Sequence, residues 1–188
     1  MRWSIFLIGL FLAAVLQVSL RSAVALGEYA PEFIMMVVVF VAFFAPRIQA
    51  LWAAWIAGML LDMLVDLPQG PGIVGPLLGP YALGFTLATY LLVLVRPMLI
   101  RRRLSTLCVM TLPFCMVTAL VVIFLHATHS WYEDVNLFWG DGRPWIEFTR
   151  QSFSALYSAV LMLLVGPVLL WTLPSWGFQS VVARTGWS

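Results

Sequence analysis

Six apolar runs, separated by polar or Pro/Gly-containing breaks, limit what this chain can fold into. They cover residues 3–20, 33–45, 48–67, 77–95, 105–125 and 152–173. The second run is short for a hydrocarbon core about 30 Å thick. Only 10% of the residues are charged, against about a quarter in a typical soluble domain. The pattern predicts an all-α polytopic membrane protein, a compact bundle of six transmembrane helices in one integral domain over residues 1–188.

The arginines predict the orientation of this bundle, because basic residues accumulate on the cytoplasmic side of a membrane. With the N-terminus and C-terminus cytoplasmic, the inner side carries Arg2, Arg47, Arg96, Arg101, Arg102, Arg103 and Arg184. The outer side carries Arg21, Arg143 and Arg150, together with Glu28, Glu32, Glu133, Asp134, Asp141 and Glu147. The net charge of +2 is too small to indicate nucleic acid as a partner.

The N-terminal run has an alternative interpretation as a cleaved secretory signal peptide. Arg2, the apolar run and the small residues "SAVA" at 22–25 are typical of such a segment. The run is long for the apolar part of a signal peptide, so a retained helix is favoured. Cleavage would leave five helices in the same orientation.

Two aspartates and a Pro/Gly-rich break lie between the third and fourth runs, in "GMLLDMLVDLPQGPGIVGPLLGPYALG" (58–84). Asp62 and Asp66 are predicted to stack on one helical face, one turn apart. An ionisable residue inside a membrane costs roughly 2.5–3.5 kcal/mol, so it faces protein or water. We expect Asp66 to mark the interface and Asp62 to accept hydrogen bonds from the broken backbone over 68–80. If Asp62 is such a structural acceptor, Asp62→Asn should be tolerated. The alternative is that Asp62 belongs to an ion site, a substrate site or a contact with a partner helix.

Other residues give little indication of chemistry. Cys108 and Cys115 are separated by about 10.5 Å of helical rise, too far for a disulfide, and are interpreted as packing residues. His126 and His129 precede acidic residues but lack the further ligands of a metal site. Nucleophile and phosphate-binding motifs are also missing from the sequence. The sequence therefore predicts no catalytic residue, no metal and no cofactor.

The stretch over 58–84 resembles the MreD family of bacterial rod shape-determining membrane proteins. The segment typical of that family has a glycine, three apolar residues, an aspartate, a Pro/Gly turn, and then G-x-x-A-L opening the next helix. The matching positions here are Gly58, Asp62, Gly79, Ala82 and Leu83, with Gly84 and Tyr90 further along. The turn is longer than the family usually shows and contains Asp66, which indicates a divergent member.

The resemblance implies a non-enzymatic scaffold of the elongasome in the bacterial cytoplasmic (inner) membrane. Such a scaffold binds a bitopic MreC-like protein, connects through it to MreB, RodA and a class B penicillin-binding protein, and supports cell shape and lateral peptidoglycan synthesis. The candidate structural or partner-interaction residues are Gly58, Asp62, Asp66, Gly79, Ala82, Leu83 and Gly84.

The family is also similar in fold to the substrate-binding subunits of energy-coupling-factor transporters, which are six-helix bundles. This similarity implies an alternative function, the substrate-binding membrane subunit of a vitamin-type transporter. A carrier of that kind needs several polar residues around a pocket. Besides Asp62, the helices offer Gln17, Thr86, Thr89, Tyr90, Thr111 and Thr118.

Overall fold

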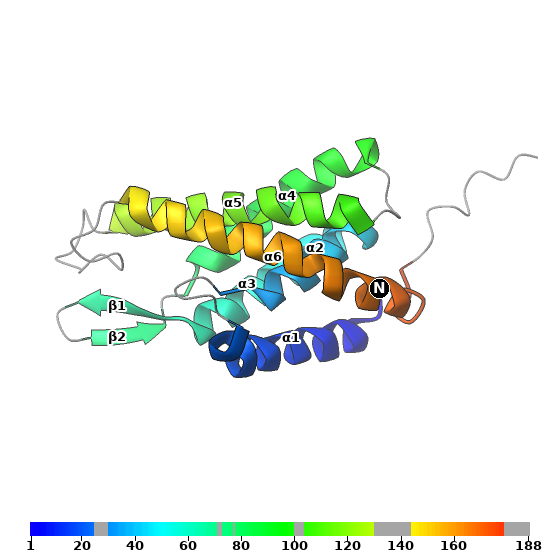
Figure 1. Ribbon diagram of the computed structural model, residues 1–188, viewed down its shortest axis with the longest axis horizontal. Coiled ribbons are helices and arrows are strands. Elements are labelled where there is room, and N and C mark those ends of the chain that lie inside the picture. The colour runs from blue at the N-terminus through cyan, green and yellow to red at the C-terminus, as the bar shows by residue number, and fades with distance from the viewer. Residues whose placement is uncertain (25–29, 71–72, 77, 100–103, 130–143, 179–188) are drawn as a thin grey trace, which may run out of the picture.

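The computed structural model describes residues 1–24, 30–70, 73–76, 78–99, 104–129 and 144–178 (Figure 1). Six α-helices run roughly along the long axis of the molecule, and a β-hairpin projects beyond one end of them. The helices are α1 (Trp3–Val24), α2 (Phe33–Phe44), α3 (Arg47–Leu64), α4 (Pro80–Val95), α5 (Leu104–His129) and α6 (Pro144–Thr172), with a short 3-10 helix η1 (Arg96–Met98) after α4. The hairpin consists of β1 (Asp66–Gly70) and β2 (Ile73–Pro76).

Four of these helices, α1, α4, α5 and α6, are long and apolar enough to cross a membrane. Helix α2 has 12 residues, a length of about 18 Å against a hydrocarbon core of about 30 Å. Helix α3 is not among the four, and it contains Arg47, Gln49 and Asp62. Within the described residues the predicted six helices are therefore confirmed, and four of them are long and apolar enough to span a membrane.

The described chain is mainly α-helical, as predicted, and a short β-hairpin at the break that follows α3 is the departure. The helix ends at Leu64 rather than at residue 67, and Asp66 begins the antiparallel hairpin. Pro68 explains this end, because a proline clashes with the carbonyl four residues earlier and favours extended backbone before it. Val65 is already extended, with φ −105° and ψ 110°. Asp62 and Asp66 therefore do not stack on one helical face, as the spacing predicted.

Other helix ends differ from the predicted boundaries by one or more turns. Helix α1 continues to Val24, and α5 extends to His129. Helix α6 begins at Pro144, two turns before the predicted start at residue 152. Between the fifth and sixth predicted runs, residues 126–129 and 144–151 are therefore helical, and residues 130–143 lie outside the described residues.

Helix α2 lies at the centre of the molecule. Every side chain from Phe33 to Phe43 is buried, and α2 packs against α1, α3, α4, α5 and α6. A helix that is apolar on all sides can be stable only when it is covered on all sides. Around it, α3 packs on α4, α4 on α5, and α5 on α6.

The described chain ends meet beside this central helix. After α6 the chain turns back, and Trp176 is buried with its ring 5.2 Å from that of Phe40. The backbone N–H of Arg2 donates a hydrogen bond to the Trp176 carbonyl at 2.8 Å. Gly9 of α1 leaves room for the indole, since a Cβ there would lie 3.2 Å from it. The C-terminal turn thus fastens the start of α1 to the bundle.

Candidate functional site

The carboxyl group of Asp62 binds the first turn of α4. Its Oδ2 accepts hydrogen bonds from the N–H groups of Gly79 and Ala82, at 2.9 and 3.1 Å. Its Oδ1 accepts one from the N–H of Tyr81 at 2.9 Å. The side chain is only 1% exposed. Both oxygens are therefore committed to the backbone of the neighbouring helix.

The start of α4 needs an acceptor that its own residues do not supply. Gly79 is the N-cap residue with a φ of 128°, a conformation that favours glycine, and it has no side chain to cap the helix. Pro80 at the first helical position lacks an N–H, which leaves the amides of 79, 81 and 82 to be satisfied. Asp62 satisfies all three from α3, and a carboxylate is electrostatically favoured at a helix N-terminus.

Gly58 allows this contact to form. A Cβ at Gly58 would lie 2.5 Å from Ala82 Cα and 2.6 Å from the Tyr81 carbonyl oxygen. Both atoms belong to backbone, so a larger residue would push α4 away from α3. Gly58 and Asp62 lie one turn apart and face the same turn of α4. Together they set the distance and the hydrogen bonding between the two helices.

The remaining candidate residues divide between the interior and the surface. Gly84 lies against α5, where a Cβ would be 3.0 Å from Thr118 Cγ2. Ala82 is buried, whereas Leu83 is 55% exposed on the outside of the bundle. Asp66 begins β1, and its side chain lies outside the described residues.

The two ends of α2 are bound in the same way by side chains of other segments. At the N-terminal end, the Phe33 N–H donates to Oε1 of Gln17, and the Glu32 N–H donates to Oγ of Ser158, at 2.7 and 3.1 Å. At the C-terminal end, Nη1 of Arg96 donates to the carbonyls of Ala42, Phe43 and Ala45 at 2.6–3.3 Å.

Sequence reasoning did not assign capping roles to Gln17, Arg96 and Ser158. The sequence indicates these roles only weakly, because each of the three is simply a polar residue within or beside an apolar run. Which helix end each side chain reaches depends on how the helices pack. We refer to these contacts and to that of Asp62 as inter-helix caps.

The polar residues considered for a carrier pocket are largely used within helices. Thr86, Thr111 and Thr118 each donate to the carbonyl four residues earlier. The ring of Tyr90 lies under the Arg47 guanidinium at 5.2 Å. Cys108 and Cys115 are buried free thiols, as interpreted from the sequence. Within the described residues, no group of three or more His, Cys, Asp or Glu side chains could hold a metal ion.

Comparison with known proteins gives one family. The family model described as "rod shape-determining protein MreD" matches residues 1–171 of the chain. The match covers all six helices except the final residue of α6, and it confirms the resemblance drawn from residues 58–84. No curated protein and no solved structure matches the chain.

Proposed function

The chain belongs to the MreD family of rod shape-determining membrane proteins, and we propose that it is a non-enzymatic scaffold of the elongasome. In this role it lies in the bacterial cytoplasmic membrane and binds a bitopic MreC-like protein. Through that partner it connects to MreB, RodA and a class B penicillin-binding protein during lateral wall synthesis.

The observation that carries the proposal is how two buried acids and one half-buried arginine are used. Asp62 caps α4, and Arg96 caps α2. Glu147 accepts from Gln151 and lies 3.6 Å from Arg150. These three groups serve the helices rather than a ligand. A carrier of a polar vitamin would need some of them to face a pocket, so the arrangement favours a scaffold over a transporter subunit.

The described cavities support the same conclusion. One lies between α1 and α6 and is lined mainly by aliphatic side chains. Another lies on α3 and α4 and is lined by Ile48, Leu51, Trp52, Trp55 and Thr86. A polar small molecule would lose its hydrogen bonds to water in either cavity and find few replacements there.

The function can be tested by depletion in a rod-shaped host. We expect depleted cells to become round, and the full-length protein to restore the rod shape. Affinity purification in a mild detergent should recover a protein with a single transmembrane helix and a large extracytoplasmic part. Asp62→Leu should reduce this recovery, because it removes the cap of α4, whereas Met63→Leu at an exposed neighbouring position should not. Unchanged cell shape, or a monomer that purifies with a bound vitamin-like molecule, would contradict the proposal.

A further inference from the structure

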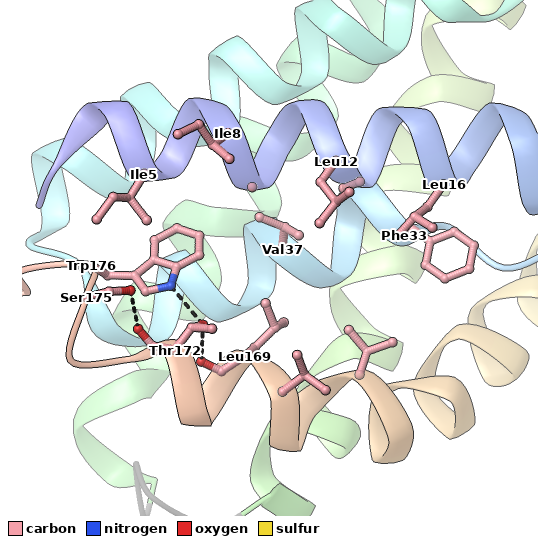
Figure 2. A pocket seen from close by; sticks show the side chains of 14 residues that line it. Ile5, Ile8, Leu12, Leu16, Phe33, Val37, Leu169, Thr172, Ser175 and Trp176 are labelled. Carbon is pink, nitrogen blue, oxygen red and sulfur yellow. Dashed lines mark hydrogen bonds between the residues drawn. The ribbon is translucent and has the colours of Figure 1, made fainter.

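A groove runs along the molecule between α1 and α6. Both helices pack against α2, which forms the floor of the groove (Figure 2). Its volume is about 290 Å³. Ile5, Ile8, Leu12 and Leu16 line it from α1, and Val165, Val168 and Leu169 line it from α6. The groove is therefore an elongated apolar site that opens sideways, toward the region that lipid occupies around a membrane protein.

One end of this groove is polar and carries a positive charge. Trp176 closes it, beside Thr172 and Ser175, as Figure 2 shows. The Arg2 side chain lies against the next residue, Gly177, with Cγ 3.1 Å from where a Cβ would be. Arg2 is exposed. Within the described part of the chain, no acidic side chain lies at ion-pair distance from it.

The size of the groove decides between two kinds of apolar occupant. A partner helix would place only a few side chains in a groove of 290 Å³, because helices pack by fitting side-chain ridges into grooves. A methylene group fills about the same volume as a water molecule, roughly 30 Å³, so the groove holds a chain of about ten carbons. An extended acyl chain can therefore fill this shape along its length, which single side chains of a partner's transmembrane helix would not do.

We propose that the groove binds one acyl chain of an anionic phospholipid, with the lipid phosphate beside Arg2. The apolar walls replace the neighbouring lipid chains, and the guanidinium supplies a charge-assisted hydrogen bond to the phosphate. Trp176 and Ser175 lie where the headgroup joins the chains. The site extends from Arg2 and Trp176, beside the start of α1, to Phe33 at the N-terminal end of α2. None of the residues that line the groove belongs to α3 or α4, so the site is separate from the Asp62 cap of α4 and does not depend on a protein partner.

Native mass spectrometry of the full-length protein in mild detergent tests this proposal. The probes are phosphatidylglycerol and phosphatidylcholine with identical acyl chains. We expect one phosphatidylglycerol to bind with clear preference. Val168→Trp fills the groove from α6 and should weaken its binding by about tenfold. Arg2→Gln should weaken phosphatidylglycerol binding by about fivefold and leave phosphatidylcholine unchanged.

Matched variants separate groove filling from general damage. Val160 and Leu7 are exposed like Val168 and Leu12, on the same two helices, but they do not line the groove. Val160→Trp and Leu7→Trp should therefore bind lipid normally, whereas Leu12→Trp should lose binding as Val168→Trp does. Equal binding of the two lipids, or equal effects of lining and non-lining variants, would overturn the proposal. Binding that occurs only after residues 179–188 are removed would also overturn it and would assign the groove to the chain's own C-terminal residues.

Discussion

At the scale of the residue, Asp62 is the side chain that ties α3 to the start of α4. The sequence predicted a hydrogen-bond acceptor that asparagine could replace. The geometry revises this expectation, because both carboxyl oxygens accept bonds, from N–H groups at 79, 81 and 82. An asparagine has one oxygen, and its NH₂ group would face a donor.

We therefore expect graded effects of substitution at this position. Asp62→Leu leaves three N–H groups without the acceptor and should lower the free energy of unfolding by about 3 kcal/mol. Asp62→Asn should fall between this variant and the wild type, because it retains one acceptor. Thermal unfolding in detergent measures both, with Met63→Leu as the control. An asparagine variant as stable as wild type would show that one oxygen is enough.

The role of Asp62 could be anticipated because an acid in an apolar run is costly unless a buried partner meets it. The roles of Gln17, Arg96 and Ser158 could not. Each binds a helix end that is far away in sequence, up to 126 residues in the case of Glu32 and Ser158. Which polar side chain meets which free amide or carbonyl depends on how the helices pack, and periodicity contains no information on that.

At the scale of the element, prolines and glycines determined what could be predicted. Pro31 and Pro46 frame α2, and its observed bounds lie within one residue of the predicted range. The β-hairpin was missed because a Pro/Gly-rich stretch gives no period-2 pattern to detect. The start of α6 was placed too late because its first two turns contain Glu147 and Arg150, which break the apolar run.

The contact between α3 and α4 leads to a prediction on two glycines. A Cβ at Gly58 and one at Gly166 would each meet an atom at 2.5 Å. At Gly58 that atom is the backbone Cα of Ala82, whereas at Gly166 it is Cδ1 at the end of the Leu104 side chain. Gly58→Ala should destabilise the protein by about 2 kcal/mol, and Gly166→Ala should have little effect, because Leu104 can change rotamer. Equal unfolding temperatures of the two variants would contradict this view of the α3–α4 contact.

At the scale of the whole molecule, three arginines and two acids lie toward opposite ends. Arg96 binds the C-terminal end of α2, next to Arg47. The backbone N–H of Arg2 binds the carbonyl of Trp176, and the ring of Trp176 packs on Phe40 of α2. The acids lie at the other end of the molecule, Glu32 at the N-terminal end of α2 and Asp62 near the C-terminal end of α3. The positive-inside rule therefore predicts that the arginine end is cytoplasmic.

Thiol labelling in intact cells checks this orientation. In a background without Cys108 and Cys115, Thr149→Cys should react with a membrane-impermeant reagent, and Ser175→Cys should react only after the cells are opened. Both positions are exposed and lie near opposite ends of α6. The reverse labelling pattern would invert the topology and place the Asp62 cap on the cytoplasmic side.

The inter-helix caps of α2 also have a consequence for biosynthesis. Helix α2 is the second helix to be synthesised. The partner of its C-terminal carbonyls, Arg96, follows only after α4, and the partner of the Glu32 amide, Ser158, is synthesised only with α6. Until then a 12-residue apolar helix, too short to span the bilayer, has polar groups at both ends without their final partners. The centre of this protein is therefore among the last parts to be completed, and a chain interrupted before residue 158 should remain dependent on the insertion machinery.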